Sequence, residues 1–306
     1  MTTPIILILG AAGQVGYDCV QVFSPIAQVH AIDRSQCDAS DLATVAALVR
    51  SIKPSIIINA VAYTAVDKAE TDAALAATLN THLPETLAIE AKKLGALLVH
   101  YSTDYVFDGN KHGAYLESDT PNPQGVYGAT KLAGEQAMNA VAAASVIFRL
   151  SWVFGAGKAL SANNFPKTML RLARERDALR VVADQHGTPT PSALVAHITA
   201  KYVAAWLKNP TSTQTLFHLS GGGAAAATHW HAFAQTTLNT AQQLGIKTQC
   251  LPNAVAAITT ADYPTPARRP ANSVMDTSKI EAWLGEPLPH WQQGLNNYLK
   301  QLAVQQ

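Results

Sequence analysis

An apolar run that leads into three spaced glycines constrains the fold of this chain more than any other feature. Residues Ile5 to Leu9 are all aliphatic, and Gly10-Ala-Ala-Gly13-Gln-Val-Gly16 follows directly. A helical pattern of apolar residues then runs from about Gln14 to Phe23. A buried strand, a glycine turn and a helix in this order open a parallel βαβ unit.

The same alternation continues along the chain and predicts an α/β fold, a doubly wound parallel sheet of the Rossmann type. Further strands are expected at 28–32, 55–59, 97–101 and 146–150, and helices at 41–52, 71–93 and 128–143. Segments 179–182 and 216–219 are expected to extend the sheet, with the helical pattern 193–207 between them. We expect Asp38 or Ser40 to cap the helix that starts near residue 41.

The pattern changes after about residue 220 and predicts a smaller C-terminal lobe. It has a helical pattern at 229–244, a Pro/Thr/Ala-rich stretch at 258–270 and an amphipathic pattern at 288–302. We expect residues 1–150, with the two sheet extensions, to form a dinucleotide-binding core, and 151–306 to form mainly a substrate-binding lobe interleaved with it. Such a lobe would cover the carboxyl ends of the strands, where open α/β sheets bind ligands.

The composition indicates a small-molecule ligand and excludes several other classes. Of the 306 residues 48% are hydrophobic, the formal net charge is +1, and no run of Lys or Arg occurs. We therefore expect no nucleic-acid partner and no membrane association. The N-terminal apolar run is too short for a signal peptide or a membrane span. The cysteines Cys19, Cys37 and Cys250 are widely spaced, which favours reduced thiols and a cytoplasmic location.

The three glycines suit a turn that cradles a diphosphate. Gly10 allows the tight turn, Gly13 lets the backbone approach the ligand, and Gly16 lets the helix pack closely. The helix N-terminus adds free N–H groups and the positive end of its dipole. The spacing is GxxGxxG, and its position between strand and helix makes it more specific than three glycines in a loop.

The residues after the second predicted strand leave the choice of cofactor open. Asp33 ends that strand, where a carboxylate can accept hydrogen bonds from the adenosine ribose of NADH. Arg34 beside it can instead hold the 2′-phosphate of NADPH. An Asp–Arg pair at a surface turn is the alternative for both residues.

A tyrosine and a lysine with YxxxK spacing predict the catalytic chemistry. Tyr127 and Lys131 share one face of a helix expected to follow Pro121-Asn-Pro123. We expect the Lys131 ammonium to stabilise the Tyr127 phenolate, so that the tyrosine can protonate a carbonyl oxygen as a hydride arrives at its carbon. Thr103 or Ser102, at the end of the fourth strand, is expected to hydrogen-bond that oxygen.

Eight stretches together resemble one family, the dTDP-4-dehydrorhamnose reductases of the extended short-chain dehydrogenases. They are 10–16, 59–70, 101–109, 127–135, 151–154, 163–165, 184–190 and 269–273. The resemblance implies that NADPH or NADH reduces the C4 keto group of dTDP-4-dehydro-L-rhamnose to give dTDP-L-rhamnose for cell-surface polysaccharide. It covers nearly the whole chain.

The resemblance also implies roles for individual residues. The catalytic set is Thr103, Tyr127 and Lys131. The expected sugar contacts are Thr64, Val66, Thr103, Tyr105 and Trp152, with Arg269, and less so Arg268, as a cation for the diphosphate. The expected cofactor contacts are Gly10, Ala12, Gly13, Gln14, Val15, Gly16, Asp33, Arg34, Asp38, Ala39, Ala60, Val61, Ala62, Tyr127 and Lys131.

The chain departs from the family pattern at positions that limit what carries over. Leu150 and Phe154 replace two hydroxyl side chains of the family's Arg-Thr-Ser-Trp-Val-Tyr stretch. Where some members bridge a dimer through magnesium at three acidic positions, this chain has Asp18, Ala193 and Gln292. We therefore predict no metal, and leave a homodimer open.

Two other functions remain as alternatives. The catalytic set is shared by sugar-nucleotide epimerases and by reductases of other 4-keto sugars. A non-catalytic, nucleotide-binding regulatory subunit is the alternative from a different class, although it would have no need of Thr103, Tyr127 and Lys131.

Overall fold

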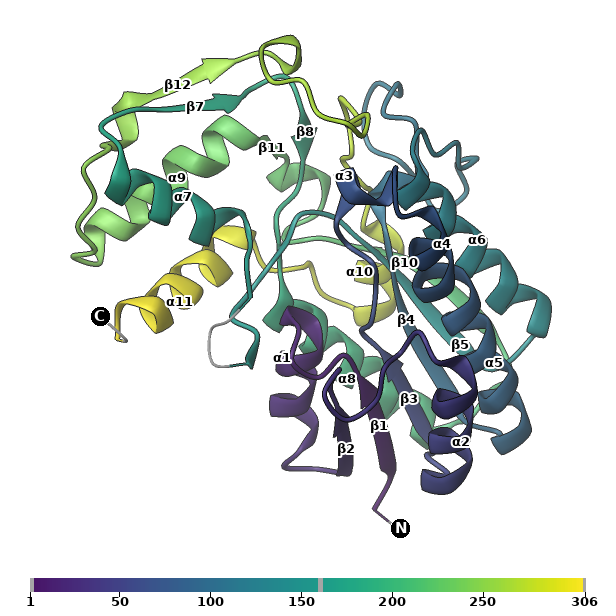
Figure 1. Ribbon diagram of the computed structural model, residues 1–306. Coiled ribbons are helices and arrows are strands. Elements are labelled where there is room, and N and C mark those ends of the chain that lie inside the picture. Colours follow the sequence, from purple (N-terminus) through teal and green to yellow (C-terminus); the bar gives the residue numbers. More distant parts are fainter. Residues whose placement is uncertain (1–2, 159–161, 305–306) are drawn as a thin grey trace.

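A six-stranded parallel sheet forms the centre of the fold (Figure 1). The computed structural model describes residues 3–158 and 162–304. The strand order is β10-β5-β4-β3-β1-β2, which confirms the expected doubly wound Rossmann-type sheet. The strands are β1 (Ile5–Leu9), β2 (Gln28–Ile32), β3 (Ile56–Asn59), β4 (Leu97–Thr103), β5 (Ser145–Leu150) and β10 (Gln214–Leu219).

Helices cover both faces of this sheet because successive side chains of each strand point to opposite faces. Ile6 and Ile8 pack with residues of α1 and α8, whereas Leu7 and Leu9 pack with residues of α2, α5 and α6. Strands buried on both sides are therefore apolar at nearly every position. The helices are α1 (Gln14–Phe23), α8 (Ser192–Lys208), α2 (Leu42–Ile52), α5 (Leu83–Leu94) and α6 (Val126–Val141).

One local expectation for the helices, the cap of α2, needs correction. Neither Asp38 nor Ser40 caps α2; the cap is Asp41, whose carboxylate accepts the Thr44 N–H at 3.1 Å. Asp38 instead accepts a hydrogen bond from the Ser40 N–H in the preceding turn. The helical segment expected at 71–93 is present and runs from α4 (Ala73–Ala77) through the π-helical turn η1 (Thr78–His82) into α5, and the short helix α3 (Val66–Ala69) precedes it.

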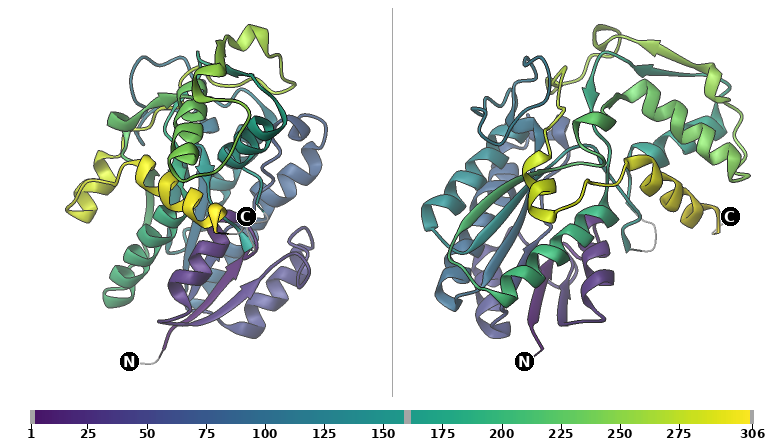
Figure 2. Two further views of the ribbon diagram at one scale, coloured as in Figure 1. Left: turned by 90° about the vertical axis from the view of Figure 1, so that its left-hand side faces the viewer. Right: turned by 180° about the vertical axis from the view of Figure 1, so that it is seen from behind.

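The C-terminal lobe lies beside the carboxyl ends of the strands, and the views in Figure 2 show it as a separate layer. Its core is a second apolar cluster that includes Phe154, Leu170, Phe233, Trp291 and Leu295. The lobe is built from α7 (Phe165–Glu175), β7 (Leu179–Val182), α9 (Trp230–Gln243), β12 (Val255–Ile258) and α11 (Trp291–Ala303). Short strands β6 (Val153–Phe154), β8 (His186–Gly187), β9 (Thr190–Pro191) and β11 (Thr228–His229) link it to the core.

The expected sheet extension at 179–182 is wrong. β7 pairs with β12 in a separate two-stranded sheet, while 216–219 does extend the main sheet as part of β10. Leu179 and Val181 face the lobe core, but Arg180 between them is exposed. A strand with one solvent-exposed face is typical of a sheet that is packed on one side only. Strands of a sheet covered by helices on both sides are apolar on both faces.

The chain returns to the core after entering the lobe. α8, β10 and α10 (Ser278–Leu284) follow α7 in the sequence, yet Val195, Leu219 and Ile280 belong to the same apolar cluster as the main sheet. The division at residue 150 with an interleaved lobe stays a prediction. Within residues 3–158 and 162–304, no helix is long and apolar enough to cross a membrane.

Candidate active site

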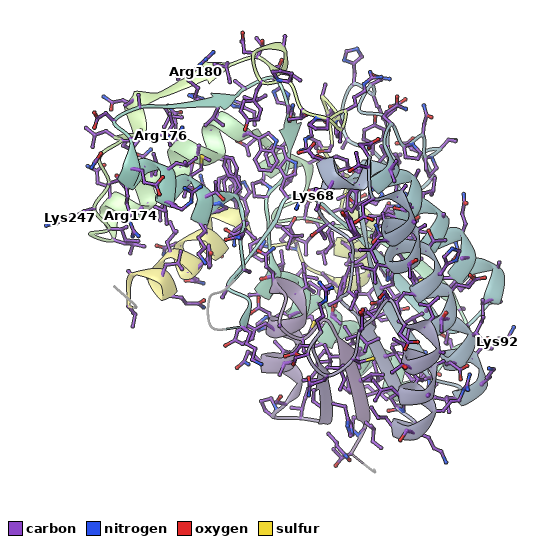
Figure 3. The ribbon with its side chains drawn as sticks, in the orientation of Figure 1. Lys68, Lys92, Arg174, Arg176, Arg180 and Lys247 are labelled. Atoms are coloured by element: carbon purple, nitrogen blue, oxygen red, sulfur yellow. The ribbon has the colours of Figure 1, made fainter. Side chains whose placement is uncertain are left out.

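A cavity of about 1090 Å³ lies where the core meets the lobe. Its core side is formed by the glycine turn after β1, the ends of β3 and β4, and the start of α6. On the lobe side it is lined in part by Arg176, at the end of α7, and Arg180, on β7 (Figure 3). Many of the predicted site residues line it, namely Gly13, Gln14, Val15, Ala60, Ala62, Thr64, Val66, Thr103, Tyr105, Tyr127, Lys131, Trp152 and Arg269.

The glycine turn has room for backbone only. Gly10 has φ +79°, and a Cβ there would lie 2.8 Å from the Ala60 carbonyl; a Cβ on Gly16 would lie 2.2 Å from the Gly10 oxygen. Gly13 caps α1 without any side-chain hydrogen bond to the first turn. The helix N-terminus is therefore open toward the cavity, which fits a diphosphate.

Asp33 lies directly after β2, beside this turn. Its Oδ1 accepts hydrogen bonds from the Ser35 N–H at 2.9 Å and the Ser35 hydroxyl at 2.5 Å, and its Oδ2 lies 3.2 Å from Lys158 Nζ. These contacts, with Ser35 the larger contributor, lower the pKa of the Asp33 carboxyl. The neighbouring Arg34 side chain is exposed.

Tyr127 and Thr103 meet inside the cavity. Burial raises the pKa of the Tyr127 phenol above its ordinary value, and a hydrogen bond with the Thr103 hydroxyl partly opposes that rise. Lys131 is not among the causes of this shift, and its expected stabilisation of the phenolate stays a prediction. A raised pKa keeps the phenol protonated at neutral pH, as a proton donor requires.

Lys131 is almost fully buried beneath the tyrosine. Its Nζ donates to the Tyr101 carbonyl at 2.5 Å and lies 3.2 Å from Nε2 of His100, whose Nδ1 is 3.1 Å from the Asn59 amide. Burial lowers the pKa of Lys131 to about 8. The lysine is thus held directly by two residues of β4, Tyr101 and His100, and Asn59 at the end of β3 holds the histidine in turn.

Ser102 also lines the cavity, but its hydroxyl is engaged by another residue. Its hydroxyl donates to Glu135, one helical turn after Lys131. Thr103 Oγ1 donates to Asp104 Oδ1 at 3.0 Å and accepts the Tyr105 N–H at 3.2 Å. The hydroxyl at the end of β4 that reaches Tyr127 is therefore that of Thr103.

Trp152 bridges the core and the lobe. It follows β5 with φ 45°, a backbone conformation that is strained for a bulky residue. Its indole stacks on that of Trp230, with ring centroids 3.6 Å apart, and Gly187 packs against its edge. Both tryptophans line the cavity and give it a broad apolar surface. Trp230 is a further residue that the sequence analysis missed.

Arg269 reaches the cavity from the segment that precedes α10. Its Nη2 donates to Asp67 Oδ2 at 2.7 Å and its Nη1 to the Tyr105 hydroxyl at 3.2 Å. The exposed Arg268 lies instead against Gln124. Only Arg269 of the two lines the cavity.

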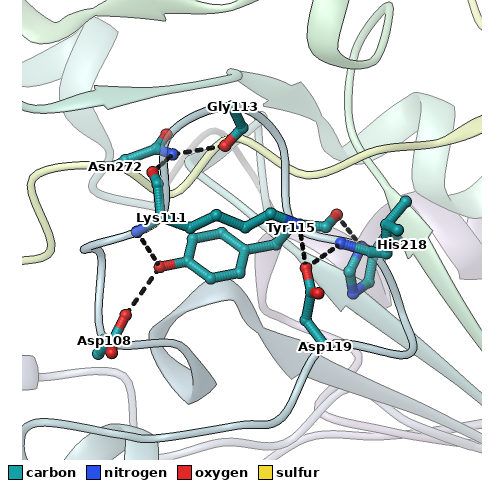
Figure 4. Close-up of polar contacts among 8 residues, drawn as sticks. Asp108, Lys111, Gly113, Tyr115, Asp119, His218 and Asn272 are labelled. Carbon is teal, nitrogen blue, oxygen red and sulfur yellow. Dashed lines mark hydrogen bonds and ion pairs between the residues drawn. The ribbon is translucent and has the colours of Figure 1, made fainter.

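The segment that carries Arg269 is anchored to the loop after β4 (Figure 4). The Asn272 amide donates to the carbonyl oxygens of Lys111 at 2.8 Å and Gly113 at 2.7 Å. The Asn272 N–H also bonds the Gly109 oxygen at 3.2 Å. These backbone acceptors anchor the chain three residues after Arg269.

Some expected cofactor residues do not line this cavity. They lie in or behind the glycine turn and around the end of β2, and are Gly10, Ala12, Gly16, Asp33, Arg34, Asp38, Ala39 and Val61. Gly10 and Gly16 act through their lack of a side chain, as described above. Asp38 is turned toward Ser40 in its own loop.

Among the described residues no three His, Cys, Asp or Glu side chains gather in a way that could hold a metal ion. Of the three positions where some relatives bridge a dimer through magnesium, only Asp18 is acidic in this chain. Its carboxylate accepts a hydrogen bond from the Ser192 hydroxyl at 2.5 Å.

Comparison with known proteins now gives the family. A family model described as "RmlD substrate binding domain" matches residues 4–304. The chain belongs to the RmlD family. It is 43% identical to a dTDP-4-dehydrorhamnose reductase of Shigella flexneri over 97% of both chains, and 38% identical to that of Burkholderia thailandensis over 98% of this chain and 99% of the other.

Solved structures of RmlD-type proteins agree with this fold. A dTDP-4-dehydrorhamnose reductase from Clostridium acetobutylicum superposes with a TM-score of 0.87 at 33% identity, covering 97% of this chain and 99% of that one. The corresponding Bacillus anthracis protein, in complex with NADP, gives a TM-score of 0.86 at 32% identity over 98% of this chain and 100% of that chain.

Proposed function

We propose that this protein is an NAD(P)H-dependent reductase that converts dTDP-4-dehydro-L-rhamnose to dTDP-L-rhamnose for cell-surface polysaccharide. The observation that carries the proposal is that Thr103, Tyr127 and Lys131 face the same cavity as the glycine turn. The relatives named dTDP-4-dehydrorhamnose reductase and the NADP complex of one of them support both the substrate and the cofactor.

In this account each catalytic residue has one task. The reduced nicotinamide, when bound, supplies the hydride to C4. Tyr127 donates its proton to the C4 oxygen, and Thr103 orients that oxygen through its hydroxyl. Lys131, still largely charged near pH 7 with a pKa of about 8, stabilises the phenolate that remains until solvent returns a proton.

The sugar nucleotide would extend from this centre toward the lobe. Thr64, Val66, Tyr105 and Trp152 surround the position expected for the sugar, and the half-buried Arg269 supplies positive charge near it. The low exposure of Arg269 makes its interaction with a phosphate stronger than that of a surface arginine.

We also propose that the protein works in the cytoplasm. The three cysteines are free and buried in the described structure, which suits a reducing compartment. A homodimer remains compatible with this proposal and is not required by it, since all proposed catalytic residues come from one chain.

Product analysis tests the proposal. The purified protein would be incubated with dTDP-4-dehydro-L-rhamnose and NADPH, and the products separated and identified by mass spectrometry and NMR. The proposal predicts a product heavier by two hydrogen atoms with the stereochemistry of dTDP-L-rhamnose. An isomer of unchanged mass would indicate an epimerase, and no conversion with either reduced dinucleotide would favour a regulatory subunit.

A further inference from the structure

Gly157, Lys158 and Asn164, which follow β6, lie against the dinucleotide turn although they are distant from it in sequence. The Lys158 N–H donates to the Ala12 carbonyl at 3.0 Å, and the Asn164 amide lies 3.1 Å from the Gln14 side-chain oxygen. Gly157, with φ +63°, brings the backbone so close that a Cβ there would lie 3.2 Å from the same Ala12 oxygen. The Lys158 backbone is therefore held close to the turn that precedes α1.

This docking places a cation on the carboxylate that follows β2. Lys158 Nζ lies 3.2 Å from Asp33 Oδ2, and the two residues are 125 positions apart. The lysine side chain is 66% exposed and the aspartate side chain 16% exposed. Lys158 can thus reorient on its flexible stem, whereas Asp33 is held by Ser35 as well.

A carboxylate at this position normally favours NADH over NADPH. It accepts hydrogen bonds from the ribose hydroxyls but repels a 2′-phosphate, which carries close to two negative charges. A lysine on the carboxylate offsets that repulsion without removing the acceptor oxygens. Since a 2′-phosphate replaces a hydroxyl that this carboxylate would accept, a cation paired with the carboxylate is a candidate to contact that phosphate.

We infer that Lys158 is a cofactor-specificity residue that lets this site accept NADPH as well as NADH. With NADH, Lys158 stays on Asp33 while the carboxylate accepts the ribose hydroxyls. With NADPH, the ammonium moves to the 2′-phosphate. Arg34 follows Asp33 directly and is exposed, and its contribution is measured separately. The inference rests on the proposed function in so far as that function requires a nicotinamide dinucleotide.

Binding measurements test the inference apart from catalysis. Dissociation constants for NADP⁺ and NAD⁺ would be determined by isothermal titration calorimetry, without sugar nucleotide, for wild type, Lys158→Ala, Lys158→Arg and Arg34→Ala. The matched control is Lys201→Ala, which breaks another exposed lysine–carboxylate pair, with Glu286, elsewhere on the chain.

We expect Lys158→Ala to weaken NADP⁺ binding about tenfold, the loss of one charge-assisted hydrogen bond, and to change NAD⁺ binding less than about twofold. Lys158→Arg and Lys201→Ala should keep the wild-type preference. In the Asp33→Asn background, Lys158→Ala should lower the NADP⁺ affinity less than it does in the wild type. The reason is that the carboxylate that would repel the 2′-phosphate is then absent.

Three results would overturn the inference. Lys158→Ala could weaken both dinucleotides equally, which would make the contact merely structural. It could leave both unchanged, or Arg34→Ala alone could remove the NADP⁺ affinity. In each case the wild type still binds dinucleotide and the proposed reductase activity survives. A wild type that binds neither dinucleotide would overturn both.

Discussion

The Glu135 carboxylate receives two hydrogen bonds from the Arg149 guanidinium, 3.0 Å from Nε and 2.7 Å from Nη2, with both side chains buried. Glu135 lies one turn after Lys131 on α6, and Arg149 lies on β5. The pair therefore joins the helix that carries the proton donor to the sheet behind it.

Breaking this pair should be costly. Glu135→Gln leaves the Arg149 charge buried without a counter-charge, so we expect a loss of about 3–5 kcal/mol in the free energy of unfolding. Urea denaturation measures it. The control is Glu175→Gln, which breaks the exposed Arg171–Glu175 pair on α7 and should cost less than about 1 kcal/mol. Equal small losses for both variants would show that the buried pair does not hold α6 in place.

The buried carboxyl of Asp104 should make the free energy of unfolding depend on pH. Burial raises the pKa of this carboxyl from 3.8 to about 6, although hydrogen bonds with Ser273 and Thr103 oppose the rise. The folded state therefore binds the proton more tightly than the unfolded chain. The contribution of Asp104 to the stability of the folded state is therefore fully present below about pH 4. It is lost as the pH rises toward and through about 6.

Asp104→Asn removes that pH dependence and keeps an oxygen to accept the Thr103 hydroxyl. Above pH 6 we expect the variant to be more stable than wild type by on the order of 1–3 kcal/mol, with the difference shrinking toward pH 4. Urea midpoints across this range test it. Asp108→Asn is the control in which the opposite sign is expected. Hydrogen bonds lower the pKa of the Asp108 carboxyl, so replacing this carboxylate should destabilise the protein near pH 7. A difference for Asp104→Asn that did not vary with pH would contradict the account.

Gly16→Ala tests the backbone cradle. A Cβ would lie 2.2 Å from the Gly10 oxygen, so the turn must shift, and we expect NADP⁺ affinity to fall by more than about tenfold. Gly134→Ala is the matched control, since its Cβ would lie 2.1 Å from the Asn80 oxygen, away from the turn. Gly134→Ala should lower the free energy of unfolding by about 1–3 kcal/mol, as Gly16→Ala should, because both place a Cβ against backbone. Unlike Gly16→Ala, it should retain its affinity for NADP⁺. Normal affinity in Gly16→Ala would exclude the cradle.

Arg269→Ala tests the proposed contact with the sugar nucleotide. We expect the Michaelis constant for the sugar nucleotide to rise about tenfold or more, with a smaller change in kcat, because a half-buried cation near the substrate is lost. The exposed Arg268→Ala serves as the control and should change the Michaelis constant little. An unchanged Michaelis constant in Arg269→Ala would remove this residue from the site.

The parts of the fold with a local signal were predictable. Apolar runs and glycine spacing located β1, the turn and α1, and YxxxK spacing placed Tyr127 and Lys131 on one helix. The cap of α2 was missed by a few residues because Asp38, Ser40 and Asp41 are equally good caps by type.

Contacts across long stretches of sequence left no such signal. The pairing of β7 with β12 and the Lys158–Asp33 contact join residues that no local pattern connects. The buried Glu135–Arg149 pair reads as an ordinary surface pair in the sequence, and only burial distinguishes the two. The raised pKa of Tyr127 likewise depends on burial by the whole site rather than on its lysine neighbour.

The most direct test of the central claim is the rate of NADPH oxidation with dTDP-4-dehydro-L-rhamnose, measured by loss of NADPH absorbance for wild type and Tyr127→Phe. Calorimetry would first establish that the variant still binds NADP⁺. The account predicts turnover by wild type and a fall of about 10²–10⁴-fold in kcat for Tyr127→Phe with NADP⁺ affinity unchanged. Turnover that survives the substitution would show that another group donates the proton, and no turnover by wild type would contradict the reductase assignment itself.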